Sequence, residues 1–293
     1  MSPMTEVESP QAPTPKSTKD RGRRRMYALL ALMFLAFALV VIYRREIRVR
    51  WWGYRLAATS DLTKRTHYLG LLATEPERAA PVARDLLAAD DAATRSFGVA
   101  LALRVPGPAG EQLLQKALHD KDSSVRQGAI LGLSVRRSAT VVPTLRALAD
   151  DPDLNVAMTA VEGLVTAGGD DALQALAELA RHHPQVGVRA QAIAALGETR
   201  APEAVPALID CLTDNAVFDG LTVSEQDALD ALQHVAPQME AQTEMPRDVH
   251  RSNAARAAIA LHVITGQDFG FLDAAPEDRA AIIAAWRAWY AKQ

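Results

Sequence analysis

The sequence repeats itself with a period of about thirty residues, and this repeat limits the possible folds more than any other feature. Three segments align on Val125, Val156 and Val188, which are spaced 31 and 32 residues apart. Each segment contains an apolar pattern, a break rich in Gly, Thr or Ala-Pro, and a second apolar pattern. One such unit cannot bury its own apolar face, whereas stacked units bury a continuous core. The repeat therefore predicts a solenoid.

The apolar residues within a unit have helical spacing. In the third unit they follow i, i+3, i+4 and i+7 twice, first at Ala190, Ile193, Ala194 and Gly197 and then at Val205, Leu208, Ile209 and Leu212. This spacing places them on one face of a helix, and no sustained alternation indicates a strand. The predicted fold class is all-α, an α-α superhelix preceded by a single transmembrane helix.

The best-formed unit reads Val-Arg-Ala-Gln-Ala-Ile-Ala-Ala-Leu-Gly over residues 188–197 and Ala-Val-Pro-Ala-Leu over residues 204–208. This pattern resembles the short HEAT repeats, of the kind also found in phycobilisome lyases. The resemblance implies a HEAT-like solenoid that serves mainly as a protein-binding scaffold. The sequence departs from the family pattern at Ala157, where Arg126 and Arg189 have no counterpart. Lyase activity is not carried over, because nothing in the sequence marks a bilin site.

Weaker copies flank these units and define the domain organisation. One of them has Arg95 near the place that Arg126 occupies in its own unit. We assign HEAT-like repeats to residues 59–216 and a C-terminal capping helix pair to residues 249–293. The repeat loses its register between them, so residues 217–248 are either a degenerate repeat or an insertion.

The N-terminal segment lacks the repeat and has the composition of a membrane anchor. Residues 1–25 are expected to form a disordered basic tail. Residues 26–43 carry no charge, and as a helix they extend about 27 Å, close to the ~30 Å hydrocarbon core of a bilayer. Residues 44–58 form a basic juxtamembrane segment, expected to lie near anionic headgroups. The predicted membrane-anchor residues, which are aromatic or basic as interfaces require, are Tyr27, Tyr43, Arg44, Arg45, Trp51 and Trp52.

A cleaved signal peptide is the alternative for this segment. Ala36-Phe37-Ala38 has the look of a cleavage site, but the apolar run continues beyond it and no small-residue site follows. The sequence therefore favours a retained single-pass anchor. Six basic residues precede the span and five follow it closely, which slightly favours a cytoplasmic N-terminus. We expect a single-pass protein of a bacterial inner membrane with its repeat domain outside the cytoplasm.

The distribution of charge excludes one class of partner. Residues 1–58 carry 11 Lys/Arg and 4 Asp/Glu, a balance of +7, whereas residues 59–293 carry 21 and 31, a balance of −10. A nucleic-acid-binding surface needs a basic footprint. The acidic repeat domain is therefore not expected to bind nucleic acid, and it suggests a protein partner of basic character.

The tripeptide Asp268-Phe269-Gly270 has the letters of a kinase magnesium motif. The chain contains no G-x-G loop, and Ser252 stands where a catalytic aspartate is required after His250-Arg251, so the match is attributed to chance. We instead predict a turn between two helices, with Gly266 closing the first and Pro276 opening the second. The aromatic residues around this turn are predicted to cap the exposed end of the solenoid: Phe269, Phe271, Trp286 and Trp289.

Other polar motifs have structural explanations. His182-His183 suits the C-terminus of a helix better than a metal site. Aspartate pairs recur at unit boundaries, where aspartate caps helices: residues 90–91, 150–151 and 170–171. Arg126 and Arg189 recur one turn into their units and are predicted to bridge neighbouring repeats. The single cysteine, Cys211, excludes an internal disulfide and a cysteine-based zinc site. We assign no catalytic, cofactor-binding or metal-binding residues and expect no cofactor.

These observations predict a membrane-anchored helical-repeat scaffold that binds another protein and has no intrinsic catalysis. Exposed residues of the second helices, such as Arg146, Glu178 and Asp210, are candidates for contact with the partner. Two alternatives stay open. One is a lyase-like or enzyme-associated accessory protein that acts on a chromophore or a modified protein, and the other is an architectural component of an envelope assembly.

Overall fold

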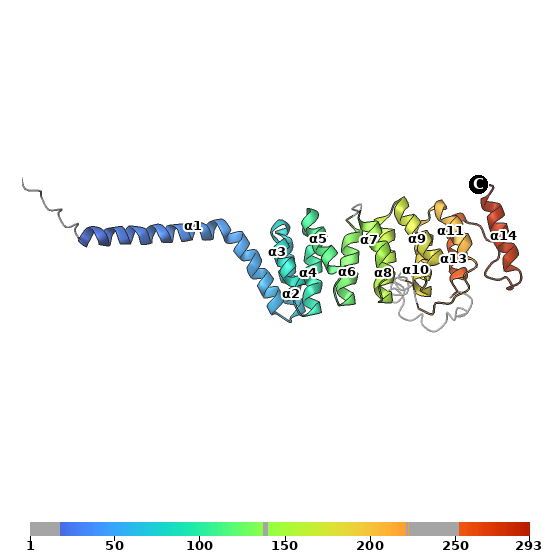
Figure 1. Cartoon of the computed structure of the whole chain (residues 1–293), viewed down its shortest axis with the longest axis horizontal. Coiled ribbons are helices and arrows are strands. Elements are labelled where there is room, and N and C mark those ends of the chain that lie inside the picture. The colour runs from blue at the N-terminus through green and yellow to red at the C-terminus, as the bar shows by residue number, and fades with distance from the viewer. Residues whose placement is uncertain (1–17, 137–139, 221, 223–251) are drawn as a thin grey trace, which may run out of the picture. The chain divides into compact units, whose positions relative to one another are not determined.

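The computed structural model describes residues 18–136, 140–220, 222 and 252–293, and these residues are predominantly helical (Figure 1). The only strand-like pairing among them is an isolated antiparallel bridge between Val217 and Ser252. The predicted all-α fold class is therefore confirmed over the described part of the chain.

The helices follow one another along the chain with short connections between most of them. In chain order they are α1 Thr18–Ala58, α2 Leu62–Ala73, η1 Pro76–Arg78, α3 Ala80–Leu87, α4 Ala92–Ala102, α5 Gly107–Ala117, α6 Ser123–Ser134, α7 Val141–Leu148, α8 Leu154–Ala167, α9 Asp170–His182, α10 Val186–Thr199, η2 Pro202–Ala204, α11 Val205–Cys211, α13 Asn253–Thr265 and α14 Arg279–Tyr290.

The repeat region consists of two layers of stacked helices. The first helices of successive units, which we call A helices, are α4, α6, α8, α10 and α13, and each contacts the next. The second helices, which we call B helices, are α3, α5, α7, α9, α11 and α14. Within the B layer, α3 contacts α5, α7 contacts α9, and α11 contacts both α9 and α14. This arrangement is the predicted solenoid, with the apolar core between the layers.

Aspartate caps fix where most A helices begin. The side chains of Asp91, Asp122 and Asp153 accept hydrogen bonds from backbone N–H groups in the first turns of α4, α6 and α8. The hydrogen bonds from Thr94 and Ser124 lower the pKa of Asp91 and Asp122, respectively. These three caps recur every 31 residues, so the repeat in the sequence is also a repeat of cap positions.

The predicted capping role of the aspartate pairs needs correction. Only Asp91 of those six residues caps a helix through its side chain. Asp170 and Asp171 lie inside the first turn of α9, whose N-cap is Gly169. Asp150 and Asp151 precede the actual cap, Asp153. Their side chains make contacts between units instead.

The core is built from small side chains and close helix contacts. A Cβ atom at Gly163 of α8 would lie 3.1 Å from Leu145 and 3.3 Å from Ile130. Gly110 of α5 is more constrained, because a Cβ there would overlap the carbonyl oxygen of Val105. Gly163 leaves room for side chains of neighbouring helices, and Gly110 lets the backbone of the turn before α5 approach closely.

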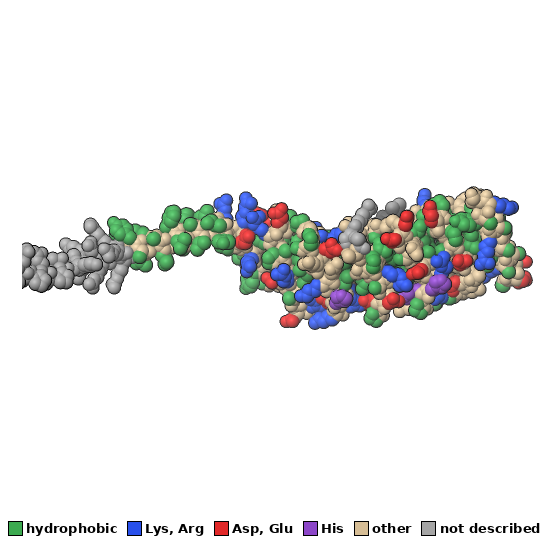
Figure 2. All heavy atoms as spheres, turned by 45° about the horizontal axis from the view of Figure 1, so that its top comes forward, with side chains coloured by type: hydrophobic (Ala, Val, Ile, Leu, Met, Phe, Trp, Pro, Cys, Tyr) green, Lys and Arg blue, Asp and Glu red, His purple; other side chains and the backbone are tan. Residues whose placement is uncertain are grey.

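The chain divides into two compact units at Trp51 and Trp52, and each is described by itself. Helix α1 covers the described part of the first unit and starts at Thr18, eight residues before the predicted span begins. Its segment Met26–Ala58 is the one helix among the described residues that is long and apolar enough to cross a membrane. Hydrophobic side chains cover the first part of this segment, directly after the grey N-terminal atoms (Figure 2). Residues 1–17 of the predicted tail lie outside the described residues.

The stack is interrupted in sequence after α11 but continues in space. Helix α13 packs directly on α10 and takes the place of the next A helix. The chain segments on either side of the interruption meet, since the N–H of Asn253 donates to the carbonyl of Ala216 at 3.0 Å. Most of the predicted degenerate repeat or insertion, residues 217–248, lies outside the described residues, and its assignment stays a prediction.

The C-terminal turn is confirmed with one change of boundary. Gly266 ends α13 in the left-handed region with φ of 68°, and the side chain of Asp268 accepts a hydrogen bond from the N–H of Gly270 at 2.7 Å. Asp-Phe-Gly is therefore a turn. Pro276 does not open the second helix as predicted, because α14 begins at Arg279 after a separate turn.

Replacing Gly110 with alanine is expected to destabilise the chain although alanine is the better helix former. The new Cβ would overlap the Val105 oxygen and lie 2.9 Å from the Ala102 oxygen, and such overpacking costs about 1–3 kcal/mol. Gly70→Ala in α2 is the matched control, because nothing lies within 4 Å of its Cβ, and it is expected to stabilise by about 0.5–1 kcal/mol. Denaturant unfolding followed by circular dichroism measures both. Equal or greater stability of Gly110→Ala would show that this packing is wrong.

Candidate functional site

The polar side-chain contacts of the solenoid are concentrated at the junctions between consecutive units. An arginine four residues after the N-cap of an A helix binds an aspartate in the loop that follows the next B helix, and we call this pair a rung. The rungs are Arg95–Asp120, Arg126–Asp151 and Arg189–Asp214. The two members of each rung are 25 residues apart in sequence. The prediction that Arg126 and Arg189 bridge neighbouring repeats is confirmed.

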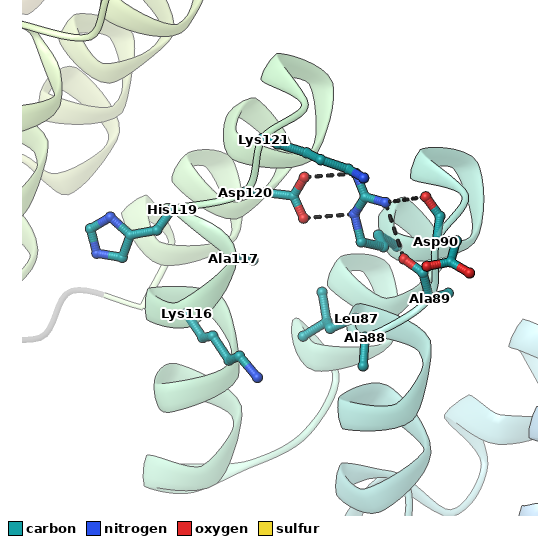
Figure 3. Close-up of a pocket in the computed structure, with 10 residues that line it drawn as sticks. Leu87, Ala88, Ala89, Asp90, Lys116, Ala117, His119, Asp120 and Lys121 are labelled. Atoms are coloured by element: carbon teal, nitrogen blue, oxygen red, sulfur yellow. Dashed lines mark hydrogen bonds and ion pairs between the residues drawn. The ribbon is translucent and has the colours of Figure 1, made fainter.

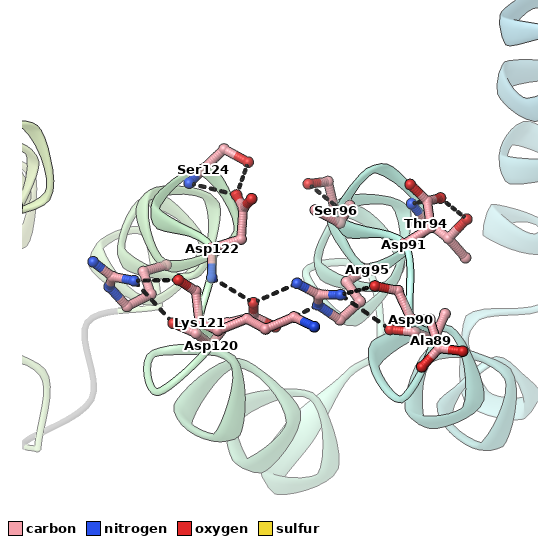
Figure 4. A network of polar contacts seen from close by, with 12 residues as sticks. Ala89, Asp90, Asp91, Thr94, Arg95, Ser96, Asp120, Lys121, Asp122 and Ser124 are labelled. Carbon is pink, nitrogen blue, oxygen red and sulfur yellow. Dashed lines mark hydrogen bonds and ion pairs between the residues drawn. The ribbon is translucent and has the colours of Figure 1, made fainter.

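Each rung has the same bidentate geometry. In the first, Nε of Arg95 donates to Oδ2 of Asp120 at 2.7 Å and Nη2 donates to Oδ1 at 2.9 Å. The remaining Nη1 donates to the carbonyl oxygens of Ala89 and Asp90 at 3.1 and 2.7 Å. Figure 4 shows this guanidinium between the two loops. One arginine thus satisfies its own loop and grips the carboxylate of the next, which is the strong form of a charge-assisted pair.

The aspartate of a rung also organises its own loop. Oδ1 of Asp120 accepts a hydrogen bond from the N–H of Asp122, the N-cap of α6, at 2.9 Å, and Asp151 does the same for Asp153. Burial alone would raise the pKa of Asp120, but the bonds from Arg95 and the Asp122 amide outweigh it and lower that pKa. The same balance, with Arg189 as the main partner, lowers the pKa of Asp214. The carboxyl groups of Asp120 and Asp214 therefore stay charged at neutral pH.

One rung is built from different residues. At the junction of α8 and α10 the two rung positions hold Ala157 and His183, four residues after Asp153 and two before Gln185, the respective N-caps. The Nδ1 atom of His183 accepts a hydrogen bond from the N–H of Gln185 at 3.2 Å. Its Nε2 atom lies 3.0 Å from Oδ1 of Asp150. The imidazole therefore joins the same two loops that an arginine and an aspartate join elsewhere.

Two shallow pockets lie beside these junctions. One of about 370 Å³ is lined by the C-terminal ends of α3 and α5 and by the Arg95–Asp120 rung. In Figure 3 the Lys116 side chain extends toward Leu87 and Ala88, whereas His119 points away from them. The other, of about 250 Å³, is lined by the ends of α7 and α9, and His182 and His183 are among its residues. Among the described residues no group of three or more His, Cys, Asp or Glu is placed to hold a metal ion.

The single thiol is not available for chemistry in this state. Cys211 lies buried at the end of α11. Burial raises its pKa to about 12, so it stays protonated at neutral pH, and a thiol rather than a thiolate is a poor nucleophile.

The predicted membrane-anchor residues all lie on α1. Tyr27, Tyr43 and Trp51 are 61%, 53% and 52% exposed. Arg44 and Arg45 are also exposed, and Trp52 is half-buried. Their contact with a membrane stays a prediction.

The predicted capping aromatics come together around α14. The rings of Phe269 and Trp286 meet edge to face with centroids 4.7 Å apart, and those of Trp286 and Trp289 are 5.8 Å apart. Trp286 and Phe271 are buried, and the guanidinium of Arg279 lies 5.2 Å from the centre of the Phe271 ring. The contacts with Phe269 and Phe271 hold α14 against the segment that follows α13, while its role as a cap stays a prediction.

The exposed charges of the B helices form pairs between units. Arg146 lies 3.5 Å from Glu178, and both Arg181 and Arg287 lie within 4 Å of Asp210. The sequence indicated Arg146, Glu178 and Asp210 by exposure alone, and their pairing across units was missed. The aspartates of the rungs and His183 were missed too. Asp120, Asp151 and His183 share a fixed position, two residues before an N-cap.

Replacing Asp120 with asparagine is expected to destabilise the chain by about 2–3 kcal/mol at neutral pH, because it leaves the buried Arg95 guanidinium without its carboxylate. Since the folded-state pKa of Asp120 is lowered, its stabilisation is complete above the unfolded value of about 3.9 and is lost as pH falls through the folded value. The stability difference between the wild type and the variant should therefore shrink below about pH 4.

Asp90→Asn is the matched control, because the exposed Asp90 contributes its backbone carbonyl and not its carboxylate to the rung. Denaturant unfolding of the three proteins between pH 3 and 7 makes the comparison. Equal effects of the two substitutions would contradict the proposed importance of the rung.

Matches to two family models agree with this architecture. Residues 110–186 match the family model for HEAT repeats, and residues 188–214 match that for the PBS lyase HEAT-like repeat. A search of curated proteins gave no significant match. Solved structures with similarity include human deoxyhypusine hydroxylase in complex with glycerol, with 18% identity, 78% of this chain and 99% of that chain covered, and a TM-score of 0.36. An engineered protein is similar at 18% identity, 75% and 97% coverage and a TM-score of 0.37. Over residues 110–214, the chain is therefore built of HEAT-type repeats.

Proposed function

We propose that this chain is a membrane-anchored helical-repeat scaffold that binds another protein and carries out no chemistry of its own. The observation that carries the proposal is the combination of HEAT-type repeats with one long helix whose apolar side chains are exposed. A soluble protein rarely exposes a contiguous apolar surface of this size, because water disfavours it. A lipid bilayer would cover the apolar side chains of the long helix, and the stacked repeats would supply the surface that binds a protein.

The membrane part of the proposal is supported by the side chains of α1. Leu32, Met33, Phe34 and Ile42 are each at least 65% exposed. Residues 26–43 carry no charge, and arginines stand on both sides of them. Aromatic and basic residues at the ends of such a segment suit the headgroup region. A bacterial inner membrane with the repeats outside the cytoplasm is the location we propose.

The binding surface that we propose is the exposed face of the B helices. Charges of both signs recur there at the repeat spacing, as in Arg146, Glu178, Arg181 and Asp210. Their mutual pairs are long and partly or largely exposed, so each contributes little to stability. Such charges can exchange their partners at low energetic cost, and a row of them gives a protein surface specificity more than bulk affinity.

We favour a binding function over the lyase-like alternative on the basis of the residues around the pockets. Those beside the first pocket are committed to a rung, as Arg95 and Asp120 are. The described residues offer no metal-binding group, and Cys211 is protonated and buried. No specific observation favours a chromophore or a modified side chain as the substrate.

The anchor is tested by membrane extraction and a topology reporter on the full chain. The wild type should resist alkaline carbonate and require detergent, whereas Leu35→Arg should weaken insertion, because arginine at a span centre costs about 2.5–3.5 kcal/mol. Alkaline phosphatase fused after Gln293 should be active and a fluorescent protein at the same place dark. Carbonate release of the wild type would exclude the anchor. A bright fluorescent fusion would reverse the proposed orientation, and loss of an N-terminal tag would indicate a cleaved signal.

The scaffold function is tested by site-specific photocrosslinking in cells. A photoreactive residue at Arg181 should give a discrete adduct, and charge reversal at Glu178 and Asp210 together should reduce its yield at least fivefold. Glu198→Lys is the matched control, because Glu198 is exposed on α10, an A helix. Adducts equally sensitive to both changes, or none at any B-helix position, would contradict the proposed surface.

A further inference from the structure

The solenoid contains one junction whose polar contacts depend on an imidazole. The other three rungs combine an arginine with a carboxylate. Arginine is protonated at every pH a folded protein meets, and a paired carboxylate is ionised above about pH 4. Their charges do not change near neutrality. Imidazole is the side chain that does change there, and among the junctions that the structure describes it replaces the aspartate only at His183.

The hydrogen bonds of His183 define its protonation. Its Nδ1 atom accepts from the N–H of Gln185, the N-cap of α10, and an atom that accepts a hydrogen bond carries no proton. Nε2 then carries the proton and donates to Oδ1 of Asp150, 3.0 Å away. The side chain of His183 is 3% exposed and that of Asp150 is 61% exposed, so the imidazole is shielded from water although its partner carboxylate is not. These two contacts fit the imidazole tautomer that carries its proton on Nε2.

The Nδ1 atom of His183 accepts the hydrogen bond that a carboxylate oxygen accepts at other junctions. Oδ1 of Asp120 accepts from the N–H of Asp122 at 2.9 Å, and Oδ1 of Asp151 accepts from that of Asp153 at 2.9 Å. All three bonds run to the N-cap of the A helix two residues later. A carboxylate oxygen can accept at any neutral pH, whereas a protonated Nδ1 becomes a donor facing another donor.

The charged groups around His183 act in both directions. Asp150 of the α7–α8 loop favours the imidazolium, and Glu178 of α9 lines the same pocket. Against it stand Arg146 of α7, His182 of α9 and Arg189 of α10, whose Nη1 donates to the His183 carbonyl at 2.8 Å. Protonation would strengthen the contact with Asp150 and remove the one with Gln185.

We propose that the junction between α8 and α10 is a pH-sensitive joint of the solenoid, in which protonation of His183 releases the N-terminus of α10 while the Arg–Asp rungs on either side hold. The missing arginine is part of the device, because Ala157 leaves this junction without the bidentate pair that fixes the others. Acidification loosens the first turn of α10 and frees the downstream units, α10 to α14, to move relative to the upstream ones.

Hydrogen exchange of the full chain in detergent tests the joint. Exchange is measured at pH 7.5 and 5.5, with labelling times scaled to the intrinsic rate at each pH. Peptides over residues 183–190 should exchange about threefold to tenfold faster at pH 5.5 after this correction, the range expected for loss of one neutral hydrogen bond. Peptides over residues 120–127 and 151–158, which begin at Arg–Asp rungs, should show no such change.

Three variants separate the joint from general acid sensitivity. His183→Asn keeps an acceptor near the Nδ1 position but does not titrate, and Ala157→Arg with His183→Asp installs a standard rung. Both should abolish the extra exchange at residues 183–190. His182→Asn is the matched control, because His182 is adjacent, exposed and outside the rung, and it should keep the response. Circular dichroism establishes whether each variant folds. If the double variant does not fold, the result for His183→Asn decides. A wild-type response equal to that of residues 120–127, or one that survives His183→Asn, would overturn the proposal.

Discussion

The bidentate contact between an arginine of one unit and an aspartate of the next is the interaction on which the rest of this structure depends. A HEAT-type unit touches only its neighbours, so the relation between consecutive units must be specified again at every junction. Apolar packing of alanine, leucine and valine supplies the driving force but tolerates small shifts. A guanidinium has fixed donor directions and does not tolerate such shifts. It binds two carbonyl oxygens in its own loop and two carboxylate oxygens in the next. We regard the rungs mainly as devices that define the register of the stack, since a buried ion pair often adds little net stability over apolar packing.

The sequence predicts the local features of this fold well. Helical spacing, the repeat period, the turn at Asp268 and the end of α13 at Gly266 all depend on residues close to one another in the chain. Arg126 and Arg189 were identified as bridges because they recur at one position in the repeat. Their partners were not, because Asp151 lies in a run of acidic residues where a helix cap was the nearer explanation.

The remaining differences between sequence and structure have physical causes. Pro276 is compatible with the first turn of a helix, but here the chain makes a further turn before α14, whose only buried side chain is Trp286. His183 has no conspicuous local signal. It lies five residues before Val188, as Asp120 and Asp151 lie before Val125 and Val156, but this alignment does not say what the side chains at that position contact. Contacts across units therefore need the structure, whereas helix positions do not.

The proposed biological role unites these observations. In this proposal the anchor would restrict the repeats to a membrane surface, and the exposed charges of the B helices would offer a partner a regular row of contacts. The spacing of these charges stays regular only if the junctions between units keep their geometry. Among the described junctions, the proposed joint at His183 would be the place where this spacing responds to pH.

A double-mutant cycle on Arg126 and Asp151 measures this central claim most directly. Denaturant unfolding of the wild type, Arg126→Ala, Asp151→Ala and the double variant gives the coupling between the two side chains independently of their separate packing. A coupling of about 1.5–3 kcal/mol, the range for charge-assisted hydrogen bonds between side chains, is the predicted result. A coupling near zero, with additive effects of the two substitutions, would show that the rungs do not hold consecutive units together.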